Sequence, residues 1–237
     1  MSIYLFCEGK TEKNVVRKFA TLANPDIKGQ GKAQVNKKIK SDLGPLLSIP
    51  KPLRTLVMRD VDEGETAESI VQSVSGAVET MLNERDFPMA ERFQSHDDYP
   101  NVYLLTLTEP DLRLALHLAA YKWDETFVNA TIDDYVLALA LREATAESFL
   151  KKNKWREINP EQLVRKVTEH IPALLRENGI RLREARDYVR LYAAIIQTHL
   201  FPATFASKAL AHARDEDIKG VFASLLAALD FLEGGSQ

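Results

Sequence analysis

The fold is decided by two stretches of the chain, SIYLFCEGKTE at residues 2–12 and LRTLVMRDVDEG at residues 53–64. Each begins with a run of β-prone apolar residues that suits one strand, and each run stops at a charged turn containing a glycine. Behind each turn, apolar residues return at the three- and four-residue spacing of a helix face. The pattern predicts two strand–turn–helix units, and Gly9 is expected to supply the backbone freedom of the first turn.

A third β-prone run covers residues 102–107 and leads into Glu109, Pro110 and Asp111. Pro110 suits the first position of a helix, so we expect another helix from there. Strand–helix repeats favour a parallel sheet with right-handed crossovers and helices on its faces. We therefore predict an α/β fold with a Rossmann-like parallel sheet.

The second half of the chain has a different texture, because no convincing β-prone run follows residue 116. Helix signals take over, including a capping-box pattern from Thr131 to Asp134. We expect an α/β domain over residues 1–115 and an all-α C-terminal subdomain over residues 116–237. Further helix starts or stops are predicted at Asn159, Pro160, Asn178 and Gly179.

Composition excludes several classes of protein. The chain has 237 residues and a formal net charge of −3, so no overall positive field draws it to nucleic acid, and any such contact needs a local patch. The single cysteine, Cys7, cannot form an internal disulfide, and we expect it to be a buried thiol. No apolar run approaches the roughly 20 residues that span a bilayer. The N-terminal run is too short for a signal peptide, so we expect a cytoplasmic protein without a membrane partner.

Acidic residues follow each predicted strand: Glu8 the first, Asp60 and Asp62 the second, and Glu109 the third. Ligands of parallel sheets bind beyond the carboxyl ends of the strands. Carboxylate oxygens are the hard donors that Mg²⁺ prefers. We therefore predict that Glu8, Asp60 and Asp62 hold Mg²⁺, with Mn²⁺ as a substitute. Glu109 is a candidate further ligand; alternatively, the acidic residues here only mark a helix start, which Asp111 favours. An isolated Asp-x-Asp is also a common turn after a strand.

These motifs resemble a known family. EGKTE at residues 8–12 is similar to the opening motif of Toprim domains, the catalytic module of topoisomerases, bacterial primases, OLD-family nucleases and small ribosomal-RNA maturases. DVDEGE at residues 60–65 resembles their Asp-x-Asp signature, with the glycine one residue earlier than in many relatives. The resemblance covers about residues 1–110. It is closest to small stand-alone Toprim-like proteins of unassigned function that carry a helical tail.

The resemblance implies roles for single residues. Glu8 would be a metal ligand or a general acid/base, and Asp60 and Asp62 would be metal ligands. Three further residues would complete the cofactor-binding turn, namely Gly9, Lys10 and Glu12. Simpler interpretations stand beside these: Glu12 suits a helix start, and Lys10 suits a solvated turn.

Basic residues near these motifs have two interpretations each. Arg59 precedes Asp60 and would contact either a phosphate or a surface carboxylate. The broken segment between the two motifs, over residues 25–52, is expected to be a partly helical connection. Its lysines are a nucleic-acid track or a solvated loop, the latter because no aromatic residues for base stacking are interleaved. They are Lys28, Lys32, Lys37, Lys38, Lys40 and Lys51.

The predicted function is divalent-metal-dependent phosphoryl transfer, with a nuclease acting on DNA or RNA phosphodiesters as the leading hypothesis. The alternative is a non-catalytic Toprim-like module that binds a nucleotide or a partner. A third hypothesis is a homo-oligomer or a larger complex as the working form. Neither the tyrosine-bearing domain of a topoisomerase nor the zinc module of a primase is recognisable in the sequence.

Overall fold

The computed structural model describes residues 2–26, 31–88, 91–152, 158–197 and 200–235. The chain divides into two compact units. The first combines Met1–Ala120 with Ala223–Gln237, and the second is Tyr121–Phe222. The last helix of the chain therefore belongs with the sheet, whereas the sequence had placed everything after residue 115 in one helical subdomain.

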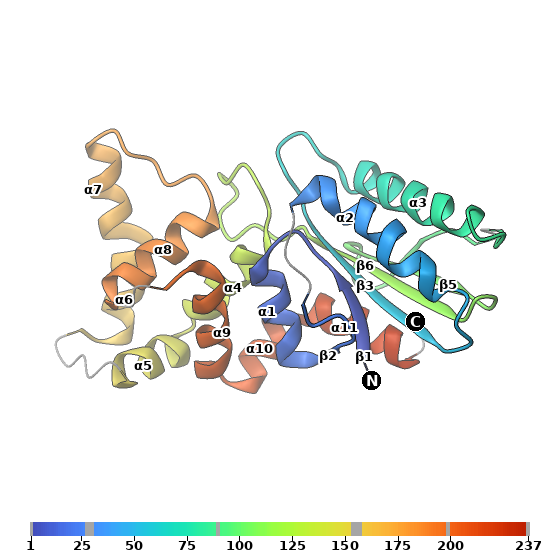
Figure 1. The fold of residues 1–237 in the computed structure, drawn as a ribbon. Coiled ribbons are helices and arrows are strands. Elements are labelled where there is room, and N and C mark those ends of the chain that lie inside the picture. The colour runs from blue at the N-terminus through green and yellow to red at the C-terminus, as the bar shows by residue number, and fades with distance from the viewer. Residues whose placement is uncertain (1, 27–30, 89–90, 153–157, 198–199, 236–237) are drawn as a thin grey trace. The chain divides into compact units, whose positions relative to one another are not determined.

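The first unit is built on one six-stranded sheet in the order β2-β1-β3-β6-β5-β4. The pairs β2–β1, β1–β3 and β3–β6 are parallel, and the pairs β6–β5 and β5–β4 are antiparallel. The predicted α/β class, with a mostly parallel sheet between helices, is confirmed (Figure 1). The strands are β1 (Ser2–Phe6), β2 (Thr21–Leu22), β3 (Leu53–Asp60), β4 (Gln94–Ser95), β5 (Val102–Leu107) and β6 (Leu112–Ala119).

Strand β6 corrects the helix expected after Pro110. The chain turns back after β5, and β6 pairs antiparallel with β5 and parallel with β3. Leucine, alanine and arginine favour helices by propensity, which made the segment look helical. Its leucines nevertheless recur at every second position, the period of a strand, and as a central strand β6 is covered on both faces.

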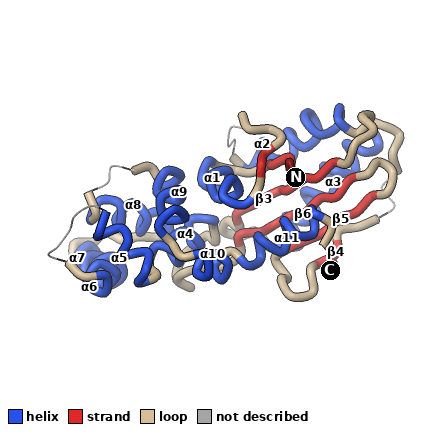
Figure 2. Tube along the Cα trace, turned by 90° about the horizontal axis from the view of Figure 1, so that it is seen from below, coloured by secondary structure: helices blue, strands red, loops and turns tan. Residues whose placement is uncertain are grey.

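Helices cover both faces of this sheet. Helices α2 and α3 lie on one face, while α1 and α11 lie on the other (Figures 1 and 2). Right-handed crossovers explain the division, because β2 and β3 flank β1 on opposite sides and their connecting helices must therefore lie on opposite faces. The helices are α1 (Lys10–Phe19), α2 (Lys32–Lys38), α3 (Ala67–Asn83) and α11 (Ala223–Glu233), and α2 continues through a π turn, Ile39–Leu43, and a 3₁₀ turn, Gly44–Leu46.

All the regular elements of the second unit, over the residues that the structure describes, are helices, and loops connect them. The predicted capping box is present: the Thr131 backbone N–H donates to Asp134 Oδ2 at 2.8 Å, and a helix starts there. Phe149, Tyr192 and Phe205 pack their rings together in its core. The helices are α4 (Ile132–Ala140), α5 (Glu143–Lys152), α6 (Pro160–Arg165), α7 (Ile171–Glu177), α8 (Ala185–Ile195), α9 (Pro202–His212) and α10 (Asp215–Val221).

Among the described residues, no helix combines the length and the apolarity that crossing a membrane requires.

The assignment of β6 as a buried central strand can be tested by truncating one of its leucines. Leu116 is 0 % exposed, so Leu116→Ala should lower the free energy of unfolding of the first unit by about 2–5 kcal/mol. Ile49 is 43 % exposed in the same unit, and Ile49→Ala should cost less than about 1 kcal/mol. Urea titration followed by circular dichroism measures both. Equal losses would contradict the assignment.

Candidate functional site at the carboxyl edge of the sheet

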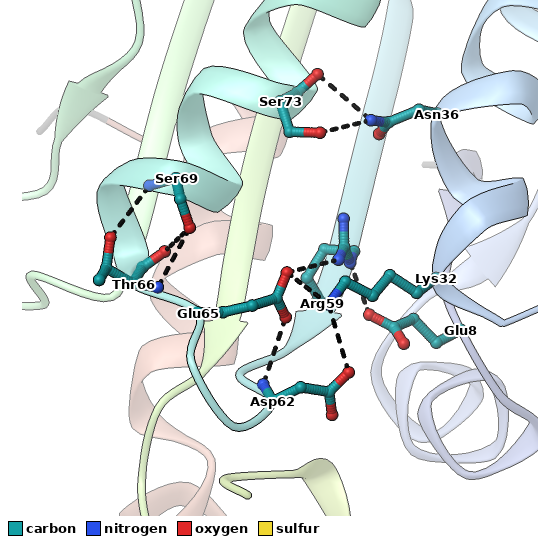
Figure 3. Close-up of polar contacts among 9 residues, drawn as sticks. All are labelled: Glu8, Lys32, Asn36, Arg59, Asp62, Glu65, Thr66, Ser69 and Ser73. Carbon is teal, nitrogen blue, oxygen red and sulfur yellow. Dashed lines mark hydrogen bonds and ion pairs between the residues drawn. The ribbon is translucent and has the colours of Figure 1, made fainter.

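The parallel pairing of β1 and β3 brings Glu8 and Arg59 together. Phe6 lies opposite Val57 in the register, so the residues two positions further along each chain face the same side. Arg59 Nε donates a hydrogen bond to Glu8 Oε1 at 2.5 Å (Figure 3). The Arg59 side chain is only 3 % exposed and that of Glu8 13 %. Arg59 thus pairs with a carboxylate, one of the two contacts predicted for it, but the pair is buried and does not lie at the surface.

The loop after β3 adds Glu65 to this pair. Gly64, at a φ of +79°, occupies the left-handed region that favours glycine and lets the loop turn back. The Glu65 N–H donates to the Asp62 carbonyl at 3.0 Å, and the Asp62 N–H donates to Glu65 Oε2 at 3.3 Å. Glu65 Oε1 lies 3.7 Å from Arg59 Nη2. Because the loop turns back on itself, the Glu65 carboxylate lies near Arg59 at the end of β3.

Lys32, the first residue of α2, completes the arrangement. Its Nζ lies 2.6 Å from Glu65 Oε1 and 3.5 Å from Asp62 Oδ2. The hydrogen bond to Glu65 is the main cause that raises the pKa of the lysine above its ordinary value. We call the alternating series Glu8, Arg59, Glu65, Lys32 and Asp62 the charge network. It sets three carboxylates against two cations at the carboxyl edge of β1 and β3.

Asp60 is a buried residue at the end of β3. Side chains alternate along β3, so Asp60 points to the face opposite Arg59, the face that α1 covers. Burial raises the pKa of the Cys7 thiol, and the charges of Glu12 and, more weakly, Asp60 add to the rise. Asp60 therefore acts on Cys7, whereas Asp62 pairs with Lys32; the sequence predicts both aspartates in one cation site.

The turn at Gly9 has a different basis from the one expected. Gly9 has extended backbone angles, with a φ of −135°, and its N–H donates to Glu12 Oε1 at 3.1 Å. A Cβ atom at Gly9 would lie 2.7 Å from Glu12 Oε2. The glycine thus makes room for the Glu12 carboxylate, and this buried carboxylate caps α1. Lys10 is exposed at the first position of that helix.

The assignment of Glu109 as a further ligand is wrong. It follows β5, which runs antiparallel to its neighbour β6. Leu107 at the end of β5 pairs with Leu112, and Leu112 pairs with Leu53 at the beginning of β3. Glu109 therefore lies at the opposite edge of the sheet from Glu8. The sequence shows that a strand ends there but not in which direction that strand runs.

The described lysines between the two motifs differ in their contacts. Lys28 lies outside the described residues. Lys38 pairs with Asp42 one helical turn away at 3.3 Å, and the Lys51 ammonium lies over the Tyr4 ring. Lys32 alone of the described members of this group is placed in an ion pair with the network. Its partner Glu65 is not singled out as a site residue by the sequence, because the contact depends on how a long connection folds.

A hard divalent cation fits these residues by donor type. Glu8, Asp62 and Glu65 offer carboxylate oxygens, the donors that Mg²⁺ and Mn²⁺ prefer. Over the described ranges, however, no three His, Cys, Asp or Glu side chains are grouped so that they could hold a metal ion. Each network carboxylate instead faces Arg59 or Lys32. A cation would therefore have to take the place of one of the protein's own charges.

Comparison with protein-family models, with curated proteins and with solved structures found no match to the chain. The Toprim resemblance therefore stays a prediction based on the motifs at residues 8–12 and 60–65.

The fit between Gly9 and Glu12 predicts opposite effects for two glycine substitutions. Gly9→Ala should displace the Glu12 carboxylate, remove its hydrogen bond, and cost about 1–2 kcal/mol of stability. Gly76 lies inside α3 with nothing within 4 Å of an added Cβ, so Gly76→Ala should stabilise by about 0.5–1 kcal/mol. Thermal denaturation of both variants measures the difference, and a stabilising Gly9→Ala would contradict the proposed packing.

The buried Glu8–Arg59 pair predicts strong coupling in a double-mutant cycle. Arg59→Met should cost about 3 kcal/mol because it leaves the Glu8 carboxylate without its buried partner. In a Glu8→Gln background the same change should cost about 1–3 kcal/mol less. Urea unfolding of the four proteins gives the coupling free energy. Additive losses would show that the two side chains do not interact in solution.

Proposed function

We propose that this chain is a divalent-metal-dependent phosphoryl-transfer protein that hydrolyses phosphodiesters of DNA or RNA. The observation that carries the proposal is the charge network: three carboxylates and two cations at the carboxyl edge of two parallel strands. Ligands of open α/β sheets bind at that edge. The Toprim resemblance of the motifs that contribute Glu8 and Asp62 points the same way.

The network supports this chemistry through the roles its residues can take. A bound divalent cation would neutralise phosphate charge and lower the pKa of a bound water. Asp62 and Glu65 would hold it, because they lie together on one loop and share one counter-charge. Glu65 thereby takes the ligand role that is predicted for Asp60 from the motif. Glu8, at the end of β1, is the carboxylate assigned to proton transfer, and Arg59 positions it.

A second candidate is a non-catalytic Toprim-like module that binds a nucleotide or a protein partner. It is favoured by a specific observation, namely that Arg59 and Lys32 already compensate the carboxylates of the network. In that case the acidic residues would hold the loop after β3 in place, and their role would be structural. The two candidates differ in whether the carboxylates are needed for cleavage.

Cleavage of plasmid DNA and of RNA in Mg²⁺ or Mn²⁺ tests the proposal. Glu8→Gln and Asp62→Asn should each lower the cleavage rate by about 100-fold or more, the scale of a lost acid–base group or metal ligand. Glu109→Gln is the matched control at the opposite edge of the sheet and should leave the rate unchanged. Cleavage that survives Asp62→Asn would overturn the site. Absence of cleavage by a folded protein that binds nucleotides would favour the module.

A further inference from the structure

Lys32 occupies a position that its own helix disfavours. The amino end of a helix carries partial positive charge, so a lysine at the first position is repelled. The first turn of α2 contains no acidic residue to offset this. The compensation comes from another part of the chain, through Glu65 Oε1 at 2.6 Å and Asp62 Oδ2 at 3.5 Å. The loop carboxylates, and not the helix, therefore account for a lysine at this position.

The start of α2 is also fixed in place, so the contact is built into the fold. The Gly31 N–H, directly before the helix, donates to the Glu8 carbonyl at 2.9 Å. One turn into the helix, Asn36 Nδ2 donates to Ser73 Oγ of α3 at 2.8 Å (Figure 3). Val35 is buried beneath the helix. These contacts fix the position of the helix, and with it the position of the Lys32 ammonium beside the loop.

We infer that Lys32 is the resident counter-cation of this carboxylate site and determines which cations can enter it. The inference rests on the proposed function, because Asp62 and Glu65 are the residues assigned there to a divalent cation. Any cation that uses both carboxylates must displace the ammonium. A monovalent ion brings the same single charge as the ammonium and gains no attraction, whereas a divalent ion brings twice that charge. Lys32 thus excludes Na⁺ and K⁺ and leaves the site to divalent ions.

Titration calorimetry of the full chain with Mn²⁺, after treatment with EDTA, tests the counter-cation role. Lys32→Gln removes the charge and should tighten Mn²⁺ binding roughly two- to fivefold, the scale of one partly exposed ion pair. Lys32→Arg keeps the charge and should bind like the wild type. Lys37→Gln, an exposed lysine of the same helix, is the matched control and should also be unchanged. Unchanged or weaker binding by Lys32→Gln would overturn the inference.

A salt comparison tests the exclusion of monovalent ions. The same titrations are run in NaCl and in tetramethylammonium chloride at equal ionic strength, so that screening is matched. The wild type should give the same dissociation constant in both salts. Lys32→Gln should bind Mn²⁺ more weakly in NaCl, because Na⁺ can now enter the site. A variant that is indifferent to the salt would contradict the selectivity role.

The same data separate the two proposals. If none of the proteins binds Mn²⁺, the cation site and the role of Lys32 both fail. If all of them bind it with one affinity, the cation site stands and only the role of Lys32 fails. Circular dichroism and the melting temperature in EDTA establish that each variant is folded. Addition of Mn²⁺ should raise the melting temperature of Lys32→Gln more than that of the wild type.

Discussion

The parallel pairing of β1 with β3 is the constraint from which the site follows. Their register puts Glu8 and Arg59 on the same face just where both strands end, and the short hydrogen bond between them closes that edge of the sheet. The Glu8 carbonyl then receives the N–H of Gly31, which fixes where α2 begins and so where Lys32 lies. A shift of one residue in this register would exchange the faces of every side chain on β3 and send Arg59 toward α1.

Burial explains why charge alternates so strictly in this network. An arginine side chain that is 3 % exposed must be paired, because an unpaired buried charge costs several kcal/mol. Glu8 and Glu65 supply that pairing, and Lys32 in turn balances Glu65 and Asp62. The same carboxylates therefore serve stability and offer oxygen donors to a cation. Catalysis requires that a bound divalent cation can replace the ion pairs that these carboxylates make with the protein's own cations. The cation affinity of the site is therefore the central quantity.

The outline of the fold could be predicted from the sequence, and so could Glu8 and Asp62 as acidic residues at the ends of neighbouring strands. Two strand–turn–helix units were recognisable because apolar runs, charged turns and helical spacing agree there. Strand β6 was missed because its residues favour helices while only the two-residue spacing of its leucines signals a strand. Glu109 was assigned to the wrong edge of the sheet because β6 was missed: the hairpin with β6 makes β5 run antiparallel to it. Glu65 and Lys32 had no local signal, because their meeting depends on α2 returning to the loop after β3.

The most direct test of the account is a crystal soaked in Mn²⁺ and measured at a wavelength where manganese scatters anomalously. We expect an anomalous peak within ligand distance, about 2.0–2.4 Å, of carboxylate oxygens of Asp62 and Glu65, with the Lys32 ammonium moved away from both. A peak on the other face of the sheet, between Asp60 and Glu12, or a fully ordered network with no peak at Asp62 and Glu65, would contradict it.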